Sequence, residues 1–211
     1  MSFLSWISTL LFPTRPTEEL VRISEADTLY AHVAPTLFLH EELPITTLLP
    51  YREPLVAAHI IESKYHRNPR AVSILGHILA EYLSEIVADE DAYTVRSFAL
   101  VPVPLSSTRF SERGYNQTEE ITNAALVELG IEGHSHARLL RRTRDTKSQT
   151  RLPRAERLRN MHGAFEADSV DPDMHYILVD DVVTTGATLQ AAHSALTRAG
   201  ASHVICLALA H

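Results

Sequence analysis

In this chain of 211 residues, the segment Ile177-Leu-Val-Asp-Asp-Val-Val-Thr-Thr-Gly-Ala-Thr-Leu189 is the most informative about the fold. The apolar run that begins at His175 and leads into this segment is typical of a buried strand. It ends in two adjacent carboxylates, Asp180 and Asp181. A turn rich in hydroxyl groups follows. Beyond it the sequence predicts an amphipathic helix over Thr188–Ala199, with Gly200 as its C-cap.

The turn has the chemistry of a site for a phosphorylated sugar. Hydroxyl donors and free backbone N–H groups at a helix N-terminus together bind an anion. Here these groups come from Thr184, Thr185, Gly186, Ala187 and Thr188. The glycine lets the backbone approach a ligand without a Cβ. Asp180 and Asp181 can accept hydrogen bonds from vicinal ribose hydroxyls, directly or through a bound Mg²⁺.

Three other interpretations share parts of this pattern. A Walker B strand also ends in acids, but none of the seven glycines is followed by the lysine of a phosphate loop. A response-regulator receiver has paired acids near its first strand, whereas here only about 30 residues follow the pair. An ordinary strand, cap and helix would not need two acids, three threonines and a glycine together. The sugar-phosphate site is therefore the preferred interpretation.

Strands and helices alternate around this segment. Helices are predicted over 54–65, 69–87 and 116–129, and buried strands over 98–103 and 204–209. Leu139 and Leu140 are the possible start of a further strand. This alternation predicts an α/β fold with a parallel, doubly wound sheet. In such sheets ligands bind beyond the carboxyl ends of the strands, where the polar loops of this sequence fall.

Prolines punctuate the first quarter of the chain, where short elements, turns and one helix around Thr17–Thr28 are predicted. We divide the chain into an N-terminal extension, residues 1–46, and a main domain, residues 47–211. The apolar run Ser2–Phe12 lacks a basic start and a cleavage site, so no signal peptide is expected. It is also too short to span a membrane, which needs about 20 apolar residues. The single cysteine, Cys206, is predicted to be buried and inert, and the lack of disulfides favours the cytoplasm.

Charge is distributed unevenly along the chain. The net charge is −7, which does not indicate a general nucleic-acid binder. From Arg138 to Arg159, however, nine Lys or Arg residues stand against only Asp145 and Glu156. This basic segment, as we call residues 138–159, favours contact with a polyphosphate or nucleic acid, and its alternative is a solvated basic face.

The segment Val179-Asp-Asp-Val-Val-Thr-Thr-Gly-Ala-Thr resembles the motif with which type I phosphoribosyltransferases bind 5-phosphoribosyl-1-pyrophosphate (PRPP). The resemblance implies that Asp180 and Asp181 face the ribose hydroxyls, with Mg²⁺ bound there directly or indirectly. It also implies that residues 183–188, starting at Val183, wrap the 5′-phosphate. The fold implied is a type I phosphoribosyltransferase-like parallel sheet flanked by helices, with a small N-terminal extension.

Further segments resemble the ComF family of competence-associated, phosphoribosyltransferase-like proteins. They are Ile61-Glu-Ser-Lys-Tyr65, Leu100-Val-Pro-Val-Pro-Leu-Ser106, Glu112-Arg-Gly-Tyr-Asn-Gln117, Arg144-Asp-Thr-Lys-Ser-Gln-Thr150 and Arg154-Ala-Glu-Arg-Leu-Arg-Asn-Met-His-Gly-Ala-Phe165. The resemblance covers roughly residues 47–211, with the motifs in the family's order.

The resemblance implies roles for these loops. The loop after the strand at 98–103 would contact pyrophosphate through Leu105, Ser106 and Ser107, unless it is a plain turn. Residues 141–159 of the basic segment match the place of the hood that closes over PRPP and brings cations to the leaving group. Its candidate residues are Arg144, Lys147, Gln149, Arg154 and Arg157. Additional candidates near a base or phosphate are Lys64, Arg113, Tyr115, Asn116 and Gln117, although Asn116 would equally serve as a helix N-cap.

Many ComF-family proteins begin with a cysteine-rich zinc module, which this sequence lacks. His32, His40, Glu41 and Glu42 have no spacing typical of a closed zinc site, and no zinc is expected. His136 is predicted to lie in an exposed loop. Two functions remain open: transfer of phosphoribosyl to an unidentified nitrogen acceptor with Mg²⁺, or PRPP sensing without turnover in DNA uptake. Single-stranded DNA contact through the basic segment and a homodimer are further expectations.

Overall fold

The computed structural model describes residues 14–88, 98–131, 135–143 and 163–211. The first part of the chain contains α2 (Pro16–Ile23), α3 (Ala26–Tyr30), β1 (Thr36–His40), β2 (Leu43–Leu49), α4 (Pro54–Tyr65) and α5 (Pro69–Ala88). The second part contains β3 (Phe98–Pro102), α6 (Ser107–Arg113), α7 (Gln117–Leu129), β4 (Leu140–Arg142), β5 (Phe165–Ala167), β6 (His175–Val182), α9 (Ala187–Ala199) and β7 (His203–Ala210).

Five of the strands form one sheet in the order β1-β2-β7-β6-β3. The pairs β2–β7, β7–β6 and β6–β3 are parallel, and only the edge strand β1 is antiparallel to its neighbour. The strands β4 and β5 form a separate antiparallel hairpin. The predicted α/β architecture with a mostly parallel sheet is therefore confirmed.

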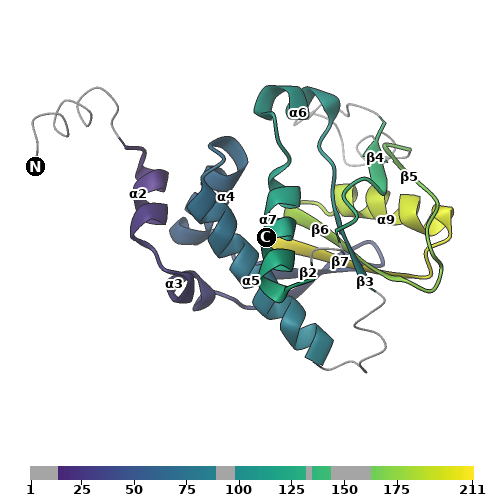
Figure 1. Cartoon of the computed structure of the whole chain (residues 1–211), viewed down its shortest axis with the longest axis horizontal. Coiled ribbons are helices and arrows are strands. Elements are labelled where there is room, and N and C mark those ends of the chain that lie inside the picture. Colours follow the sequence, from purple (N-terminus) through teal and green to yellow (C-terminus); the bar gives the residue numbers. More distant parts are fainter. Residues whose placement is uncertain (1–13, 89–97, 132–134, 144–162) are drawn as a thin grey trace, which may run out of the picture.

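Helices cover both faces of the sheet, and Figure 1 shows α4, α5 and α7 on one side and α9 on the other. Alternate residues of each strand face opposite sides, which divides the core in two. Leu100, Ile177 and Leu207 belong to the core under α4, α5 and α7. Val101, Leu178 and Cys206 belong to the core under α9 and the β4–β5 hairpin. Burial raises the pKa of the Cys206 thiol to about 12, in agreement with the predicted inert cysteine.

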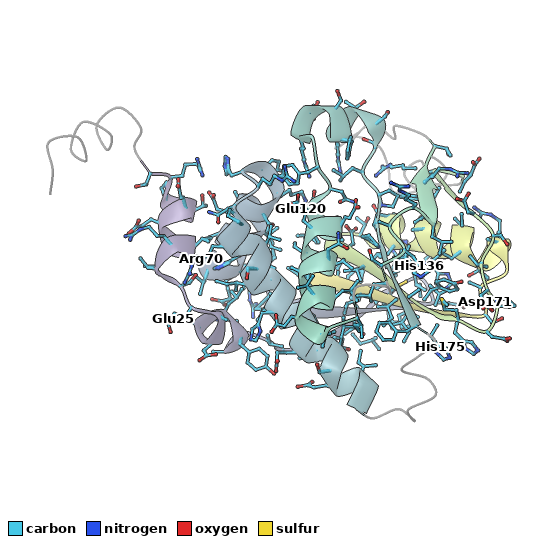
Figure 2. The ribbon with its side chains drawn as sticks, in the orientation of Figure 1. Glu25, Arg70, Glu120, His136, Asp171 and His175 are labelled. Carbon is cyan, nitrogen blue, oxygen red and sulfur yellow. The ribbon has the colours of Figure 1, made fainter. Side chains whose placement is uncertain are left out.

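The N-terminal quarter differs from the prediction. The single helix around Thr17–Thr28 is wrong, because the backbone is extended at Ser24 and two helices form instead. Arg70, at the start of α5, donates to the carbonyls of Val21 and Ser24 at this break (Figure 2). The hairpin of β1 and β2 was not predicted. It joins the main sheet, and the proposed boundary after residue 46 falls inside β2.

Among the residues that the structure describes, no helix combines the length and the apolar character needed to cross a membrane. His136, predicted in an exposed loop, lies close to strand β3, and its backbone N–H donates to the carbonyl of Leu100 at 2.9 Å. Figure 2 shows His136 on the α9 side of the molecule, apart from α6. The pair β3–β6 starts with Phe98 opposite His175, so its carboxyl end lies at Pro102 and Val179.

Candidate functional site

The acid pair lies at the carboxyl end of β6, as predicted. The strand is buried over Tyr176–Val179 because it has a parallel neighbour on each side and helices on both faces. Asp180 is half-buried, and Asp181 is only 4% exposed. Two adjacent carboxylates, one of them almost completely buried, need compensating charge or hydrogen bonds.

Most of the compensating contacts are made to Asp181. Its Oδ2 lies 2.8 Å from Lys64 Nζ at the end of α4 and accepts a hydrogen bond of 2.9 Å from Gln117 Nε2 at the start of α7. Its Oδ1 accepts from the backbone N–H of Val182 at 2.8 Å. Asp181 therefore connects β6 with the helices on one face of the sheet, and its oxygens are already engaged.

Asp180 is in a different position. Its Oδ1 accepts from the backbone N–H of Asp181 at 2.9 Å, and the side chain lines a pocket. Burial, and then the neighbouring charge of Asp181, raise the pKa of Asp180 from 3.8 to about 7, while Lys64 acts in the opposite direction. Of the two acids, Asp180 is the better candidate for contact with ligand hydroxyls or a metal ion.

The predicted phosphate turn joins β6 to α9. Gly186 is the N-cap of α9 with φ +81°, in the left-handed region that favours glycine. A Cβ on Gly186 would lie 2.5 Å from His40 Cβ and 3.1 Å from Ile45 Cδ1, so the β1–β2 hairpin also requires a glycine here. Thr185 Oγ1 accepts from the backbone N–H of Ala187. The Ala187 N–H is thus engaged within the turn, while the N–H groups that follow it in the first turn of a helix have no partner inside the helix, which is what an anion site uses.

A pocket of about 540 Å³ lies over the strand ends. It brings together the acid pair, part of the phosphate turn and the loop after β3. Its lining residues are Tyr51, Lys64, Val103, Pro104, Leu105, Arg109, Gln117, Arg142, Asp180, Asp181, Val182, Val183, Thr184, Thr188 and His211.

The loop after β3 reaches the pocket through Leu105. The two serines that follow have other positions. Ser106 is the N-cap of α6, where its Oγ accepts from the backbone N–H of Arg109 at 3.4 Å, and Ser107 begins the helix with its side chain exposed. The structure thus places one of the three predicted pyrophosphate-loop residues on the pocket wall and uses Ser106 as a helix cap.

Asn116 and Tyr115 form hydrogen bonds that hold together the elements around the pocket. Asn116 caps α7, accepting from the backbone N–H of Thr118 at 3.2 Å, and its Nδ2 donates to the carbonyl of Val103 at 3.1 Å. The buried Tyr115 hydroxyl donates to the carbonyl of Ser63 at 2.9 Å. The cap interpretation of Asn116 is therefore confirmed, and both side chains fix the elements around the pocket.

Arg113 acts through Gln117. Its Nη1 donates to Gln117 Oε1 at 2.9 Å, and its guanidinium lies 4.9 Å from the centre of the Tyr65 ring. Because Gln117 Nε2 in turn donates to Asp181, a hydrogen-bonded chain runs from Arg113 to the acid pair. Gln117 and Lys64 line the pocket, as the sequence predicted for residues near a ligand.

Tyr51, Arg109 and His211 line the pocket but fall outside every segment that the sequence interpretation assigned to the site, while Arg142 lies in the basic segment without having been named as a candidate. Tyr51 follows a proline-rich stretch that looked like a plain turn, and Arg109 is one arginine in a short helix. Neither carries a motif that could have identified it. The predicted hood residues Arg144, Lys147, Gln149, Arg154 and Arg157 lie outside the described residues.

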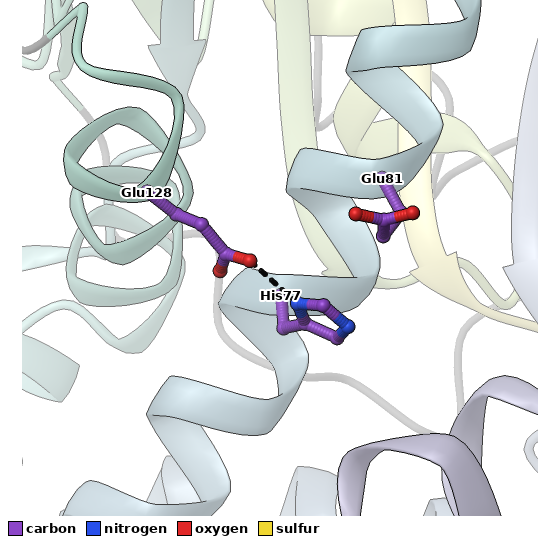
Figure 3. A group of neighbouring side chains, drawn as sticks. All are labelled: His77, Glu81 and Glu128. Atoms are coloured by element: carbon purple, nitrogen blue, oxygen red, sulfur yellow. Dashed lines mark hydrogen bonds and ion pairs between the residues drawn. The ribbon is translucent and has the colours of Figure 1, made fainter.

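A second group of potential metal ligands lies away from the pocket. His77 and Glu81 on α5 and Glu128 on α7 have ligand atoms within 4.8 Å of one another (Figure 3). His77 Nδ1 and Glu128 Oε1 form a hydrogen bond of 2.6 Å, which accounts for the contact without a metal ion. All three side chains are partly or largely exposed, so we treat the group as a surface ion pair.

Comparison with known proteins identifies the family. A model described as phosphoribosyl transferase domain matches residues 63–211. The "DNA utilization protein YhgH" of Escherichia coli K12 is 31% identical over 160 residues, 76% of this chain and 68% of that protein. Its Salmonella typhi counterpart is 36% identical over 105 residues, 50% and 45% of the two chains. The "Competence protein ComFC" of Streptococcus pneumoniae is 30% identical over 131 residues, 62% and 54%.

The matched region extends from the end of α4 through β7 and contains the acid pair, the phosphate turn and the loop after β3. The match spans about half the length of the Salmonella typhi relative. The mostly parallel sheet with helices on both faces agrees with the type I phosphoribosyltransferase fold. The chain belongs to the phosphoribosyl transferase domain family and, within it, to the ComF-type phosphoribosyltransferase-like proteins.

Proposed function

We propose that this protein binds PRPP and transfers its phosphoribosyl group to a nitrogen nucleophile with release of pyrophosphate. One observation carries the proposal. The half-buried Asp180 shares a single pocket with the hydroxyl-rich N-terminus of α9 and with two arginines, Arg109 and Arg142. A ribose 5-phosphate bearing an anionic leaving group needs these three kinds of partner.

Each part of the pocket has a role in this proposal. Thr184 and Thr188, with the first N–H groups of α9, bind the 5′-phosphate. Asp180 accepts hydrogen bonds from the ribose hydroxyls. Arg109 and Arg142 stabilise the charge that accumulates on pyrophosphate as it leaves. Lys64 and Gln117 hold Asp181, and thereby keep the strand end in place.

The reaction is a displacement at C1 of the ribose. The lone pair of the acceptor nitrogen forms the new bond to C1, and the electron pair of the C1–O bond leaves on pyrophosphate. The proton of the acceptor nitrogen passes to solvent. Because the transition state resembles an oxocarbenium ion, the protein contributes by positioning the reactants and stabilising charge.

Mg²⁺ is part of the proposal, and the donors in the pocket fit it. A carboxylate oxygen is a ligand that Mg²⁺ accepts, and both acids line the pocket, but Asp181 is also engaged with Lys64 and Gln117. When bound together with PRPP, the ion would neutralise charge on the pyrophosphate. Asp180 is the residue of this chain that we expect to hold it, directly or through water.

The test is a binding titration of PRPP with Mg²⁺ by calorimetry. Asp180→Asn is expected to weaken binding, whereas Asp27→Asn, an exposed acid on α3, is a matched control that leaves it unchanged. Pyrophosphate release with a panel of nucleobases then measures turnover. Unchanged PRPP affinity in Asp180→Asn would show that the site is misassigned.

The second candidate is a PRPP-binding protein without turnover that assists DNA uptake. It is favoured by the names of the relatives, a DNA utilization protein and a competence protein, and by the net positive charge of the basic segment. PRPP binding without product from any acceptor would select this candidate. Titration with single-stranded DNA over a salt series tests the basic segment, because binding to phosphates weakens steeply with salt.

A further inference from the structure

The order of the strands fixes which groups lie on either side of the acid pair. The strands lie side by side in the order β2-β7-β6-β3, and the end of β6 carries Asp180 and Asp181. The ends of β2 and β7 lie on one side of it, and the end of β3 lies on the other. All of these strands are parallel, so their carboxyl ends share one edge of the sheet.

Two ring-bearing residues occupy the β2–β7 side of the pocket. Tyr51 follows β2, and His211 follows β7, and both line the pocket. Their backbones are fixed to each other, because Tyr51 N donates to the carbonyl of His211 at 2.8 Å and His211 N donates to the carbonyl of Leu49 at 3.1 Å. The His211 ring packs against Phe38 of β1 with 4.5 Å between ring centres. Tyr51 remains 37% exposed.

Cationic residues occupy the other side. Arg109 lies on α6, directly after the β3 loop, and is partly buried at the pocket wall. Among the ion pairs that the structure gives for the described residues, none involves Arg109. Arg142 lines the pocket from β4, with its guanidinium 5.3 Å from the centre of the Phe165 ring. A fixed arginine facing the pocket is a partner for an anionic group.

We infer that Tyr51 and His211 form the acceptor subsite, and that it takes a planar heteroaromatic base. The inference rests on the proposed function. Displacement at C1 requires the nucleophile to approach from the face opposite the leaving group. With pyrophosphate drawn toward Arg109 and Arg142, the acceptor enters from the side of Tyr51 and His211. An exposed tyrosine ring on a fixed backbone is a stacking platform, and the His211 ring nitrogens can bond the polar edge of a base.

The N-terminal hairpin thereby becomes part of the site. Phe38 of β1 supports the His211 ring, His40 at the end of β1 lies against Gly186 in the phosphate turn, and Tyr51 follows β2. Phe38 and His40, which belong to the part that the sequence suggested as a separate extension, thus support the side of the pocket on which we place the acceptor.

The experiment compares ribose 5-phosphate with the nucleoside 5′-monophosphates AMP, GMP, CMP and UMP in calorimetric titrations of the whole chain. All five share the 5′-phosphate and ribose, so their difference in affinity reports the base alone. At least one monophosphate is expected to bind about tenfold or more tightly than ribose 5-phosphate, the increment of one base stacked on an aromatic ring. In Tyr51→Ala this ratio should fall toward one while ribose 5-phosphate affinity stays unchanged, and Tyr51→Phe should retain it.

The control is Tyr30→Ala, since Tyr30 on α3 is also 37% exposed and lies outside the pocket lining. It should leave the ratio unchanged. Two outcomes would overturn the acceptor subsite and leave the proposed function standing. In one, the tighter binding of the monophosphate persists in Tyr51→Ala combined with His211→Ala. In the other, ribose 5-phosphate binds but no monophosphate binds more tightly than it does. Failure of ribose 5-phosphate to bind the wild-type chain overturns both.

Discussion

Lys64 and Asp181 meet across 2.8 Å, from the end of α4 and the end of β6, with the Lys64 side chain 20% exposed and that of Asp181 6% exposed. The pair fastens a helix on one face of the sheet to the strand that carries the site. It also gives the two adjacent acids different roles. Both line the pocket, but Asp181 is bound to Lys64, Gln117 and the backbone of Val182, and Asp180 makes none of these contacts.

Lys64→Met is expected to lower the free energy of unfolding by about 1–3 kcal/mol, because a nearly buried carboxylate loses its counter-charge while Gln117 and Val182 still donate to it. Urea unfolding at pH 7 measures the change. Adding Asp181→Asn should restore part of the loss, because the unpaired charge is then gone. Equal and additive losses in the two single variants would mean that the pair does not interact in solution.

Gly186→Ala is expected to lower stability by about 2 kcal/mol or more, from the left-handed backbone and from the contact with His40. It should also weaken PRPP binding, since the N–H groups of the turn shift. Gly130→Ala is the matched control, with φ +68° and nothing within 4 Å of the new Cβ, and it should show the backbone cost alone. A His40→Gly change removes the Cβ that the new methyl group would meet, so it should rescue Gly186→Ala in part, and no rescue would contradict the contact.

The raised pKa of Asp180 predicts a pH dependence of stability. The folded protein keeps this carboxyl protonated between its ordinary value of 3.8 and about 7, whereas the unfolded chain does not. The unfolded chain therefore binds fewer protons in this window, and the group makes stability fall as pH rises through it. Asp180→Asn should become more stable relative to wild type from pH 4 to pH 7, as urea unfolding can follow. A difference independent of pH would refute the raised pKa.

Arg15→Met tests the buried Glu62, which accepts hydrogen bonds from Arg15 Nε at 3.1 Å and Thr17 Oγ1 at 2.7 Å. Burial alone would raise the pKa of Glu62, but the hydrogen bond from Arg15 and then that from Thr17 outweigh it and lower the pKa. The stabilisation is thus present above about pH 4.5 and is lost as pH falls below it.

The loss of stability in Arg15→Met should therefore be largest near neutral pH and shrink in acid. Arg22→Met is the control, because Arg22 and Glu19 form a pair on α2 with side chains 66% and 43% exposed. Such an exposed pair contributes little to stability. If both variants lose the same small amount of stability at pH 7, the burial of Glu62 has no energetic consequence.

Local sequence signals predicted the elements that carry the chemistry. The helix at 116–129, with Asn116 as its N-cap, was confirmed, as were the acid pair at a strand end and the glycine of the turn. These features depend on neighbours in the chain. Their physical causes, such as capping and left-handed glycine, can be recognised in a few residues.

The hairpin of β1 and β2 could not be predicted in the same way. Pro44 lies inside β2, which weakens the strand signal, and the strand exists because Ile45 and Thr46 pair with Cys206 and Leu207 at the other end of the chain. The pairing of Lys64 with Asp181 and the position of Tyr51 beside His211 likewise depend on contacts distant in sequence. Periodicity and local motifs do not predict contacts between residues that are distant in sequence.

The position of β7 has a consequence for how the chain folds. Among the described strands, the hairpin of β1 and β2 pairs with the rest of the sheet only through β7, while β6 and β3 lie on the other side of β7. Until residues 203–210 are in place, the two parts of the sheet have no strand in common. Closing contacts of such long sequence separation is slow, so the pocket should assemble in a late step, after the helices have formed. Newly synthesised chains would acquire ligand affinity abruptly, once β7 has been inserted.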